Sequence, residues 1–221
     1  MPDDADDAAH EVTEALRVEA AAALRGLLHA YISHECDDAE LAAMRDWAND
    51  TTARLDAGAP RSRMLLMQRA RTSSASSGWL PGGSPGFEDR AIAGAANPAS
   101  IVFDARQEGD VMVADITIDA AFEGAPNRAH GGVVAAAFDD FTGSIIGMIG
   151  EPAFTGELTV RFLHPVPVGV PLRLRTWLES RQGRKLYIHA DATVEGEVLA
   201  TCRATYITVD PAVFAASPDP R

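Results

Sequence analysis

Two features of one segment could do chemistry. The run FEGAPNRAHGG, residues 122–132, places His130, Gly131 and Gly132 directly before the apolar stretch VVAAAFDDFTGSIIGMIG. Glycines at a helix start let another molecule approach the backbone closely. The first amide groups of a helix have no partner inside it, and the helix dipole adds positive potential there. Such a helix start can polarise a carbonyl or hold an oxyanion, although an isolated HGG is also consistent with His130 being a structural cap.

The second feature is a pair of acids, Asp139 and Asp140, within the apolar stretch. Acidic side chains are rarely buried unless they are paired or functional. A carboxylate in apolar surroundings has a raised pKa, which makes it a better base near neutral pH. We expect Asp139 to be buried and Asp140 to reach solvent where the helix emerges from its sheet.

The spacing between the two features matters, because Asp139 follows His130 by nine residues. In a helix this places it about 180° around the axis and about 13 Å along it. The two residues therefore cannot easily meet on one substrate atom within a single chain. A second copy with an antiparallel helix could bring Asp139 to the partner's glycine turn. The spacing predicts a site shared across a dimer, and full activity in a monomer would contradict it.

Hydrophobic periodicity predicts the elements that hold these residues. Residues 8–57 read as two helices, with Asp37 and Glu40 at capping-box spacing before the second and Gly58 after it. From residue 100 the apolar period changes to two, as in strands, apart from one helix. The expected elements are strands beginning at 101–103 and lying at 111–118, 155–164, 170–181, 185–195 and 198–209, with the helix at 130–147.

These elements predict an α+β fold. Each strand has one apolar face, which is typical of an antiparallel sheet covered on one side, and the helix is apolar nearly all round and should be buried. We therefore expect about six strands wrapped round one long central helix. The expected organisation is a helical N-terminal extension at 1–70, a loop or linker packing on the core at 71–99, the sheet and helix at 100–209, and a C-terminal tail at 210–221.

Composition restricts the class of protein. The net charge is −13, and residues 1–60 contribute −10 of it, from 14 acidic and 4 basic side chains. An acidic surface opposes nucleic-acid binding. We expect no membrane span, because no apolar run approaches the roughly 18 residues required, and a cytoplasmic location, because the acidic start lacks the charge of a signal peptide. Cys36 and Cys202 have no metal-like spacing and are expected to be buried thiols.

Three segments together resemble the hotdog-fold acyl-CoA thioesterases of the PaaI-like type: FEGAPNRAHGGVVAAAFDDFTG, FTGELTVRFLHPVPVG and RQGRKLYIHADATV. The resemblance covers about residues 87–209, and the upstream FEDRAIAGAANPAS is similar to the branch of thioesterase superfamily members 4 and 5. It implies hydrolysis of an acyl-CoA to a free acid and CoA, in fatty acid metabolism. It also implies that no metal or cofactor takes part and that the protein is a homodimer or a dimer of dimers.

The resemblance implies a role for each residue of the site. Asp139 matches the catalytic acid, which activates water or attacks the thioester carbonyl. The amide of Gly131 or Gly132 would polarise that carbonyl. His130 would position the thioester, and Thr155, 16 residues after the acid, would orient the attacking water.

The GRK hairpin would bind the nucleotide end of the substrate. Arg184 and Lys185 are candidates for the CoA phosphates, because basic side chains suit phosphate oxygens. A charged hairpin tip also serves solubility, so these two residues alone do not distinguish a phosphate site from an ordinary solvated turn.

Two alternatives stay open. One is a non-catalytic acyl-CoA-binding or regulatory protein of the same fold, which gains weight because Gly124 stands where some relatives have asparagine. The other is a hotdog enoyl-CoA hydratase or dehydratase. That chemistry needs an acid and a histidine on one active-site helix, and no histidine follows Asp139 within the predicted helix.

Overall fold

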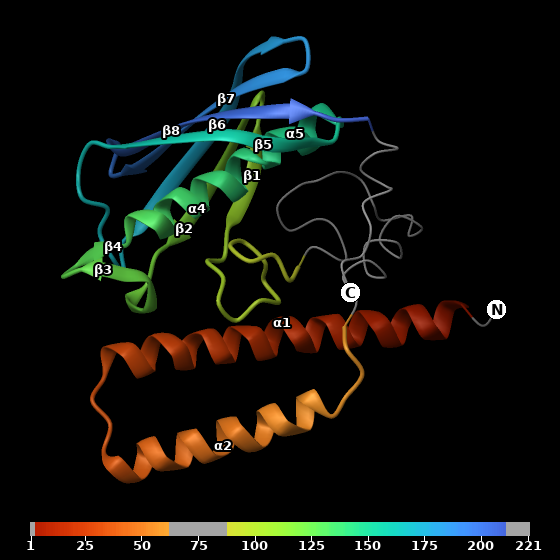
Figure 1. The fold of residues 1–221 in the computed structure, drawn as a ribbon, viewed down its shortest axis with the longest axis vertical. Coiled ribbons are helices and arrows are strands. Elements are labelled where there is room, and N and C mark those ends of the chain that lie inside the picture. Colours follow the sequence, from red (N-terminus) through yellow and green to blue (C-terminus); the bar gives the residue numbers. More distant parts are fainter. Residues whose placement is uncertain (1–2, 62–87, 211–221) are drawn as a thin grey trace.

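The computed structural model describes residues 3–61 and 88–210, with side chains from residue 13 onward. A curved sheet wraps round a central helix, and a pair of N-terminal helices lies beside this domain (Figure 1). The α+β class, the antiparallel sheet and the N-terminal helices are as predicted from the sequence. Residues 62–87, which hold Trp79, Phe87 and most of the predicted linker, and residues 211–221 of the predicted tail lie outside the described residues.

One antiparallel sheet of six strands forms the domain, in the order β1-β2-β6-β7-β8-β5. Its outer strands are therefore β1 and β5, and an edge strand leaves a row of backbone groups without a sheet partner. The strands are β1 (Asp104–Glu108), β2 (Val111–Thr117), β5 (Ala153–Phe162), β6 (Pro171–Gln182), β7 (Lys185–Val194) and β8 (Glu197–Thr208).

The central helix packs into the concave side of the sheet and is broken once. Helix α4 (Gly131–Thr142) buries Phe138 and Phe141 completely, and α5 (Ser144–Ile149) continues it after Gly143. The central helix predicted at 130–147 is therefore confirmed, and the break at Gly143 was not predicted. The Tyr206 hydroxyl donates to the Asp139 carbonyl (3.0 Å), which also accepts the Gly143 amide (3.3 Å). A second donor at that carbonyl competes with the helical hydrogen bond at the break.

The same stretch is apolar and long enough to cross a membrane. Among the described residues, Gly131–Ile149 is the one helical segment of 18 or more residues that is apolar enough to cross a membrane, with a mean hydropathy of 1.4. The expectation that no apolar run has such a length was therefore too strict. Because the sheet wraps this helix (Figure 1), its composition is also that of a core helix, and it is weak evidence for a span.

The first strand begins later than predicted. Residues 101–103 are not a strand, and β1 starts at Asp104. The amide of Ile101 donates instead to the carbonyl of Ile92 (2.6 Å), so the preceding loop takes the hydrogen bond that a sheet neighbour would accept. Between the second strand and the helix lie η1 (Ala120–Phe122) and a small hairpin, β3 (Glu123–Ala125) with β4 (Arg128–Ala129).

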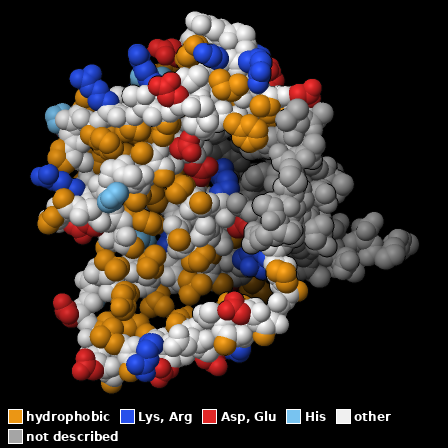
Figure 2. All heavy atoms as spheres, in the orientation of Figure 1, with side chains coloured by type: hydrophobic (Ala, Val, Ile, Leu, Met, Phe, Trp, Pro, Cys, Tyr) orange, Lys and Arg blue, Asp and Glu red, His pale blue; other side chains and the backbone are white. Residues whose placement is uncertain are grey.

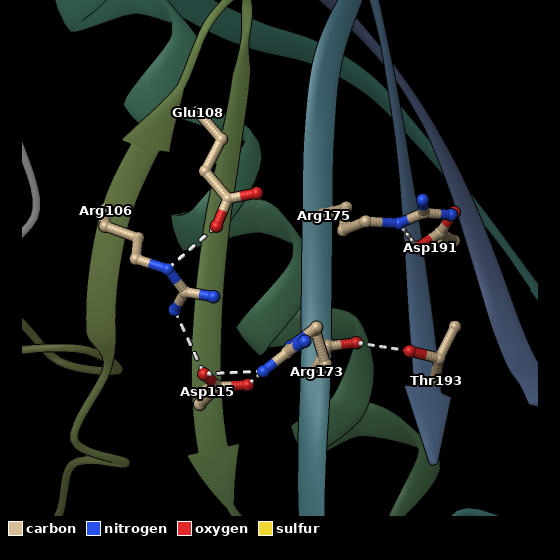
Figure 3. A network of polar contacts seen from close by, with 7 residues as sticks. All are labelled: Arg106, Glu108, Asp115, Arg173, Arg175, Asp191 and Thr193. Atoms are coloured by element: carbon tan, nitrogen blue, oxygen red, sulfur yellow. Dashed lines mark hydrogen bonds and ion pairs between the residues drawn. The ribbon is translucent and has the colours of Figure 1, made fainter. Parts of the chain in front are cut away.

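Ion pairs cover part of the outer face of the sheet. Figure 3 shows Arg106 and Arg173 converging on Asp115, while Arg175 contacts Asp191 on the neighbouring strand. The pairs join β1 to β2, β2 to β6 and β6 to β7. Asp191 lies on this charged face, and its low exposure of 6% follows from the guanidinium of Arg175 that covers it.

The N-terminal helices differ in how they contact the domain. In α1 (Asp3–Ser33) a stripe of less exposed residues faces the domain: Glu14, Val18, Ala21, Arg25 and His29. Helix α2 (Asp38–Asp56) begins with the predicted capping box of Asp37 and Glu40 and has no buried residue. Figure 2 shows hydrophobic side chains gathered along both helices, and the exposed ones include Leu24, Leu27, Leu28, Tyr31, Ile32, Leu41 and Trp47.

The two cysteines differ in accessibility, which corrects the expectation that both are buried. Cys202 is 1% exposed, and burial raises the pKa of its thiol to about 12. Cys36, in the connection between α1 and α2, is half-buried. Because the thiolate is the reactive form, we expect one thiol per native chain to react with a chromogenic disulfide reagent at pH 8, and Cys36→Ser to remove that reaction. Two fast-reacting thiols in the folded protein would contradict the burial of Cys202.

Candidate active site

The HGG turn forms the start of α4, and His130 is its N-cap. The Nδ1 atom of His130 accepts the amide of Gly132 (3.0 Å), and a Cβ on Gly132 would lie 3.1 Å from the imidazole ring. The amide of Gly131 makes no hydrogen bond within the described part of the chain, and Gly131 is exposed. The structural-cap interpretation of His130 is therefore confirmed. Of the two candidate amides, Gly131 is the one with a free N–H.

An open pocket lies in front of this turn. Its volume is about 510 Å³, and its lining comes from residues 124–125, 128–131 and 162–166. Most of the lining surface is apolar, and Phe162 lies opposite Gly131, where a Cβ on Gly131 would be 3.4 Å from the Phe162 ring. The pocket therefore places an apolar wall and a free amide around the same space.

Asp139 lies at the other end of α4, beside the edge strand. Its Oδ1 atom accepts the hydroxyl of Thr155 on β5 (3.0 Å). A bulge between Thr155 and Glu157 places Thr155 opposite the buried Tyr206 of β8, on the helix side of the sheet. Without that extra residue the alternation along β5 would turn Thr155 away from the helix. Two residues 16 positions apart thus meet, and the predicted role of Thr155 in orienting water stays a prediction.

The burial predicted for the two acids is reversed. Asp139 is exposed, whereas the Asp140 side chain is 20% exposed and its Oδ2 atom is buried. The reason is positional: the edge strand β5 is the last strand on the side of Asp139, so a single chain leaves that carboxylate open. Asp140 faces the loop that precedes β1, where Arg90 lies 3.7 Å away. The prediction that Asp139 is set in apolar surroundings is wrong for the isolated chain.

Asp139 and the HGG pocket are separate within one chain. None of the described residues that line the pocket is Asp139 or Thr155. The two groups lie near opposite ends of both α4 and β5, since Thr155 is the third residue of β5 and Phe162 the last. Asp139 and the Gly131 amide therefore do not meet within one chain, and the site shared across a dimer stays a prediction.

Comparison with known proteins shows what the domain is similar to. The sequence model of the thioesterase superfamily matches residues 127–201, which contain the HGG turn, the central helix, β5, β6, β7 and the start of β8. The crystal structure of a thioesterase superfamily protein superposes with a TM-score of 0.69 over 86% of this chain and 90% of that one, at 21% identity. Residues 127–201 thus resemble the thioesterase superfamily in sequence, and the sheet with its central helix forms a domain with a hotdog fold.

Two curated relatives match parts of this chain. The acyl-coenzyme A thioesterase THEM5 of Mus musculus is 38% identical over 66 residues, which are 30% of this chain and 27% of the relative. The acyl-coenzyme A thioesterase THEM4 of Xenopus laevis is 30% identical over 84 residues, 35% of this chain and 38% of the relative. The matched region thus spans well under half of either relative.

The hotdog domain has no room for an asparagine side chain at position 124, before the histidine. At that position a Cβ on Gly124 would lie 2.9 Å from the His130 Cα atom. Backbone would have to move before any side chain fitted there. A donor to an oxyanion in this chain is therefore expected from the backbone.

Arg184 and Lys185 lie at the exposed tip of the β6–β7 hairpin. Arg184 donates from Nε to the carbonyl of Thr208 (2.9 Å), and Lys185 pairs in register with Ile207. On the other side of β8, Thr155 pairs with Tyr206, which is adjacent to Ile207. The hairpin therefore lies at the Asp139 end of the sheet, and its role toward CoA phosphates stays a prediction.

Sequence reasoning missed three residues that the fold brings to the site. Phe162 and Arg128 line the HGG pocket, and Arg128 has no acidic partner among the described residues. Tyr206 holds the Asp139 carbonyl and also contacts the Thr142 hydroxyl (3.0 Å). Arg128 stands two residues before the HGG histidine and could have been considered from that position. Phe162 and Tyr206 look like ordinary strand residues in the sequence.

Asp140 makes the stability of the hotdog domain depend on pH. Burial raises its pKa, and the attraction of Arg90 and a hydrogen bond to the Ala93 backbone only partly oppose this. A carboxyl whose pKa is raised on folding stabilises the fold fully below its unfolded pKa of about 4, and that stabilisation is lost as the pH rises through the folded pKa.

We expect Asp140→Asn to gain stability relative to the wild type as the pH rises from 4 to 7, because the variant has no carboxyl to ionise. Urea unfolding of both proteins at several pH values measures the difference in free energy of unfolding. The attraction between Arg90 and the ionised carboxylate is already part of this pKa, so its loss in the variant is included in the expected difference. A difference that stays constant or shrinks toward neutral pH would contradict the raised pKa.

Proposed function

We propose that the protein is an acyl-CoA thioesterase that hydrolyses a thioester to a free acid and CoA. The hydrogen bond between Thr155 and Asp139 carries this proposal. It orients an exposed carboxylate that has no basic partner among the described residues. The sequence match to the thioesterase superfamily and the similarity to two acyl-coenzyme A thioesterases support the same reaction class.

The proposed site lies between two copies of the chain. Strand β5 is a sheet edge, so a second β5 can pair with it antiparallel and extend the sheet. A pairing centred on Thr159 would put Leu158 opposite the partner's Val160. Counting the bulge, it would also put Thr155 opposite the partner's Phe162. Asp139 would then face the partner's Gly131 amide across the pocket, and each dimer would have two such sites.

The chemistry follows from these positions. The Gly131 amide donates to the thioester oxygen and stabilises the negative charge that develops there. Asp139 either takes a proton from water as the water attacks the carbonyl carbon, or attacks that carbon itself and is released by water. In both routes the C–S bond breaks, the thiolate of CoA leaves and takes up a proton, and water supplies the oxygen of the acid. Thr155 keeps the Asp139 carboxylate in place by donating to Oδ1.

Basic side chains flank the proposed site from both chains. Arg184 and Lys185 lie at the Asp139 end of one chain, and Arg128 lies in the pocket that the partner supplies. Phosphate groups of CoA suit these cations. We propose the hairpin as the contact for the nucleotide phosphates. The cytoplasmic location and the role in fatty acid metabolism stay predictions from the sequence.

A panel of acyl-CoAs tests the function directly. Purified full-length protein is mixed with each substrate, and a chromogenic thiol reagent reports the CoA released. Cys36→Ser serves as the enzyme in this assay, so that the protein's own accessible thiol adds no signal. Sustained CoA release beyond one equivalent per chain supports the proposal. Binding of acyl-CoA without release would overturn it in favour of an acyl-CoA-binding protein, and loss of the conjugated absorbance of an enoyl-CoA would overturn it in favour of a hydratase.

A further inference from the structure

Helix α1 contacts the hotdog domain through two polar side chains on its less exposed stripe. Arg25 makes four hydrogen bonds to the loop before β1: to the carbonyls of Ala95 (3.1 Å), Asn97 (2.7 Å) and Ser100 (3.0 Å), and to the Ser100 hydroxyl (3.0 Å). Ser100 is completely buried, and Ala21, one turn before Arg25, is 3% exposed. An arginine that satisfies several carbonyls in one loop fixes the helix on that loop.

One turn further along α1, His29 reaches the segment that precedes the HGG turn. Its Nδ1 atom accepts the amide of Ala121 (3.2 Å), and its ring meets the Phe122 ring edge-on, with centroids 5.6 Å apart. Because Nδ1 is the acceptor here, the ring proton of a neutral His29 is on Nε2. Both contacts fall on η1, the short turn at Ala120–Phe122.

The η1 turn is joined to the N-cap of α4. The carbonyl of Phe122 accepts the amide of His130 (2.8 Å), and Gly124 packs directly on the His130 backbone. His130 in turn accepts the Gly132 amide. A continuous series of contacts therefore runs from His29 through Phe122 to His130 and the amides at the start of α4.

We infer that His29 is a positioning residue: α1 holds the η1 turn, and through it the orientation of the HGG turn and its free Gly131 amide. The N-terminal helix is then part of the machinery of the site and not only an appendage. A polarising amide works only if it points at the developing charge, and misplacement by an ångström can cost a large factor in rate. The catalytic part of this inference rests on the proposed thioesterase function.

Three substitutions in the full chain separate the contacts of His29. His29→Phe keeps a ring against Phe122 and removes the acceptor for Ala121. His29→Asn removes the ring but places an amide oxygen near the position of Nδ1. His29→Ala removes both. The matched control is His34→Phe, since His34 is an exposed histidine of the same helix end whose ring nitrogen contacts only Ser33 and Ala30.

Two readouts test the inference. Hydrogen exchange by mass spectrometry follows the backbone amides of residues 119–134, with residues 185–194 of the central strand β7 as an internal reference. We expect faster exchange at 119–134 in His29→Phe and His29→Ala, partial recovery in His29→Asn, and no change in His34→Phe or at 185–194. With the best acyl-CoA, we expect kcat of His29→Phe to fall roughly three- to thirty-fold with little change in KM.

Each of the following results would contradict one part of the inference. Unchanged exchange at 119–134 in His29→Phe and His29→Ala would overturn the inference, and faster exchange over the whole domain would overturn it in favour of general destabilisation. Faster exchange at 119–134 with an unchanged kcat would overturn the catalytic part. If the wild type hydrolyses no acyl-CoA, the proposed function fails by that result, and the exchange data still decide whether α1 positions the HGG turn.

Discussion

Asp139→Asn is expected to lower kcat by roughly 100- to 10,000-fold, the range for loss of a general base or acid. Asparagine has nearly the same shape and can keep a hydrogen bond with the Thr155 hydroxyl, but its amide cannot take a proton from water or attack a thioester. KM is expected to change little, because the substitution removes an interaction made in the transition state. The measurement is CoA release over time, with the mass of the assembly determined by light scattering to confirm that the variant still dimerises.

Three further variants serve as controls for this test. Asp110→Asn makes the same chemical change in the exposed turn between β1 and β2 and is expected to keep wild-type activity. Thr155→Ser keeps the hydroxyl that donates to Asp139, whereas Thr155→Val removes it at constant shape, so only the latter should lose activity. If Asp139→Asn hydrolyses acyl-CoA at the wild-type rate, the carboxylate is not the catalytic acid.

Two inactive variants are expected to restore activity when they share a dimer. Asp139→Asn supplies an intact HGG turn, and Gly131→Pro supplies an intact carboxylate. In a mixed dimer one site has both intact groups and the other has neither. Co-expression with two different affinity tags isolates that species, which should show about half of the wild-type activity per dimer. Each variant alone should show almost none.

Gly131→Pro is chosen because it removes the amide proton while keeping a residue that suits the start of a helix. Gly131 is the first residue of α4, where proline is well accommodated, and His130 before it has the extended backbone, φ −62° and ψ 127°, that a following proline requires. Loss of one oxyanion donor lowers kcat by roughly 100- to 1,000-fold. Gly131→Ala keeps the amide, and its Cβ would be in ordinary contact with Phe162, so it is the matched control.

The mixed dimer distinguishes a shared site from a site within one chain. If each chain carried its own complete site, every chain in the mixed species would be inactive and pairing would restore nothing. An inactive mixed dimer of confirmed composition would therefore exclude the shared site. Full activity of a monomeric form would exclude it as well.

The sequence pattern predicted most of the local structure. The alternation of apolar residues identified the last four strands to within about two residues. The Asp37 and Glu40 spacing located the start of α2. These features depend on contacts between residues close in the sequence. The late start of β1 and the break at Gly143 were not predicted, because each depends on a distant partner: Ile92 accepts from Ile101, and Tyr206 contacts the carbonyl of Asp139.

The candidate site also combines features that the sequence predicted with features that depend on distant contacts. The residue types and spacing in HGG and the two aspartates marked where chemistry could occur. The assignment of burial to the two acids was reversed, because helical periodicity does not say which side of the helix ends at a sheet edge. Asp139 lies where the sheet stops at β5, and Asp140 lies where the loop with Arg90 covers the helix.

The sequence by itself determined which groups are available: a helix start with two glycines, a carboxylate nine residues after its histidine, and a hydroxyl sixteen residues beyond that carboxylate. Only the tertiary structure decided how these groups are oriented. The bulge between Thr155 and Glu157 turns the hydroxyl toward Asp139. The Gly132 amide donates to the His130 ring, whereas the Gly131 amide has no partner among the described residues. Helix α1 docks beside the turn through Arg25 and His29. Such orientations depend on contacts between segments far apart in the chain, and local propensity carries no information about them.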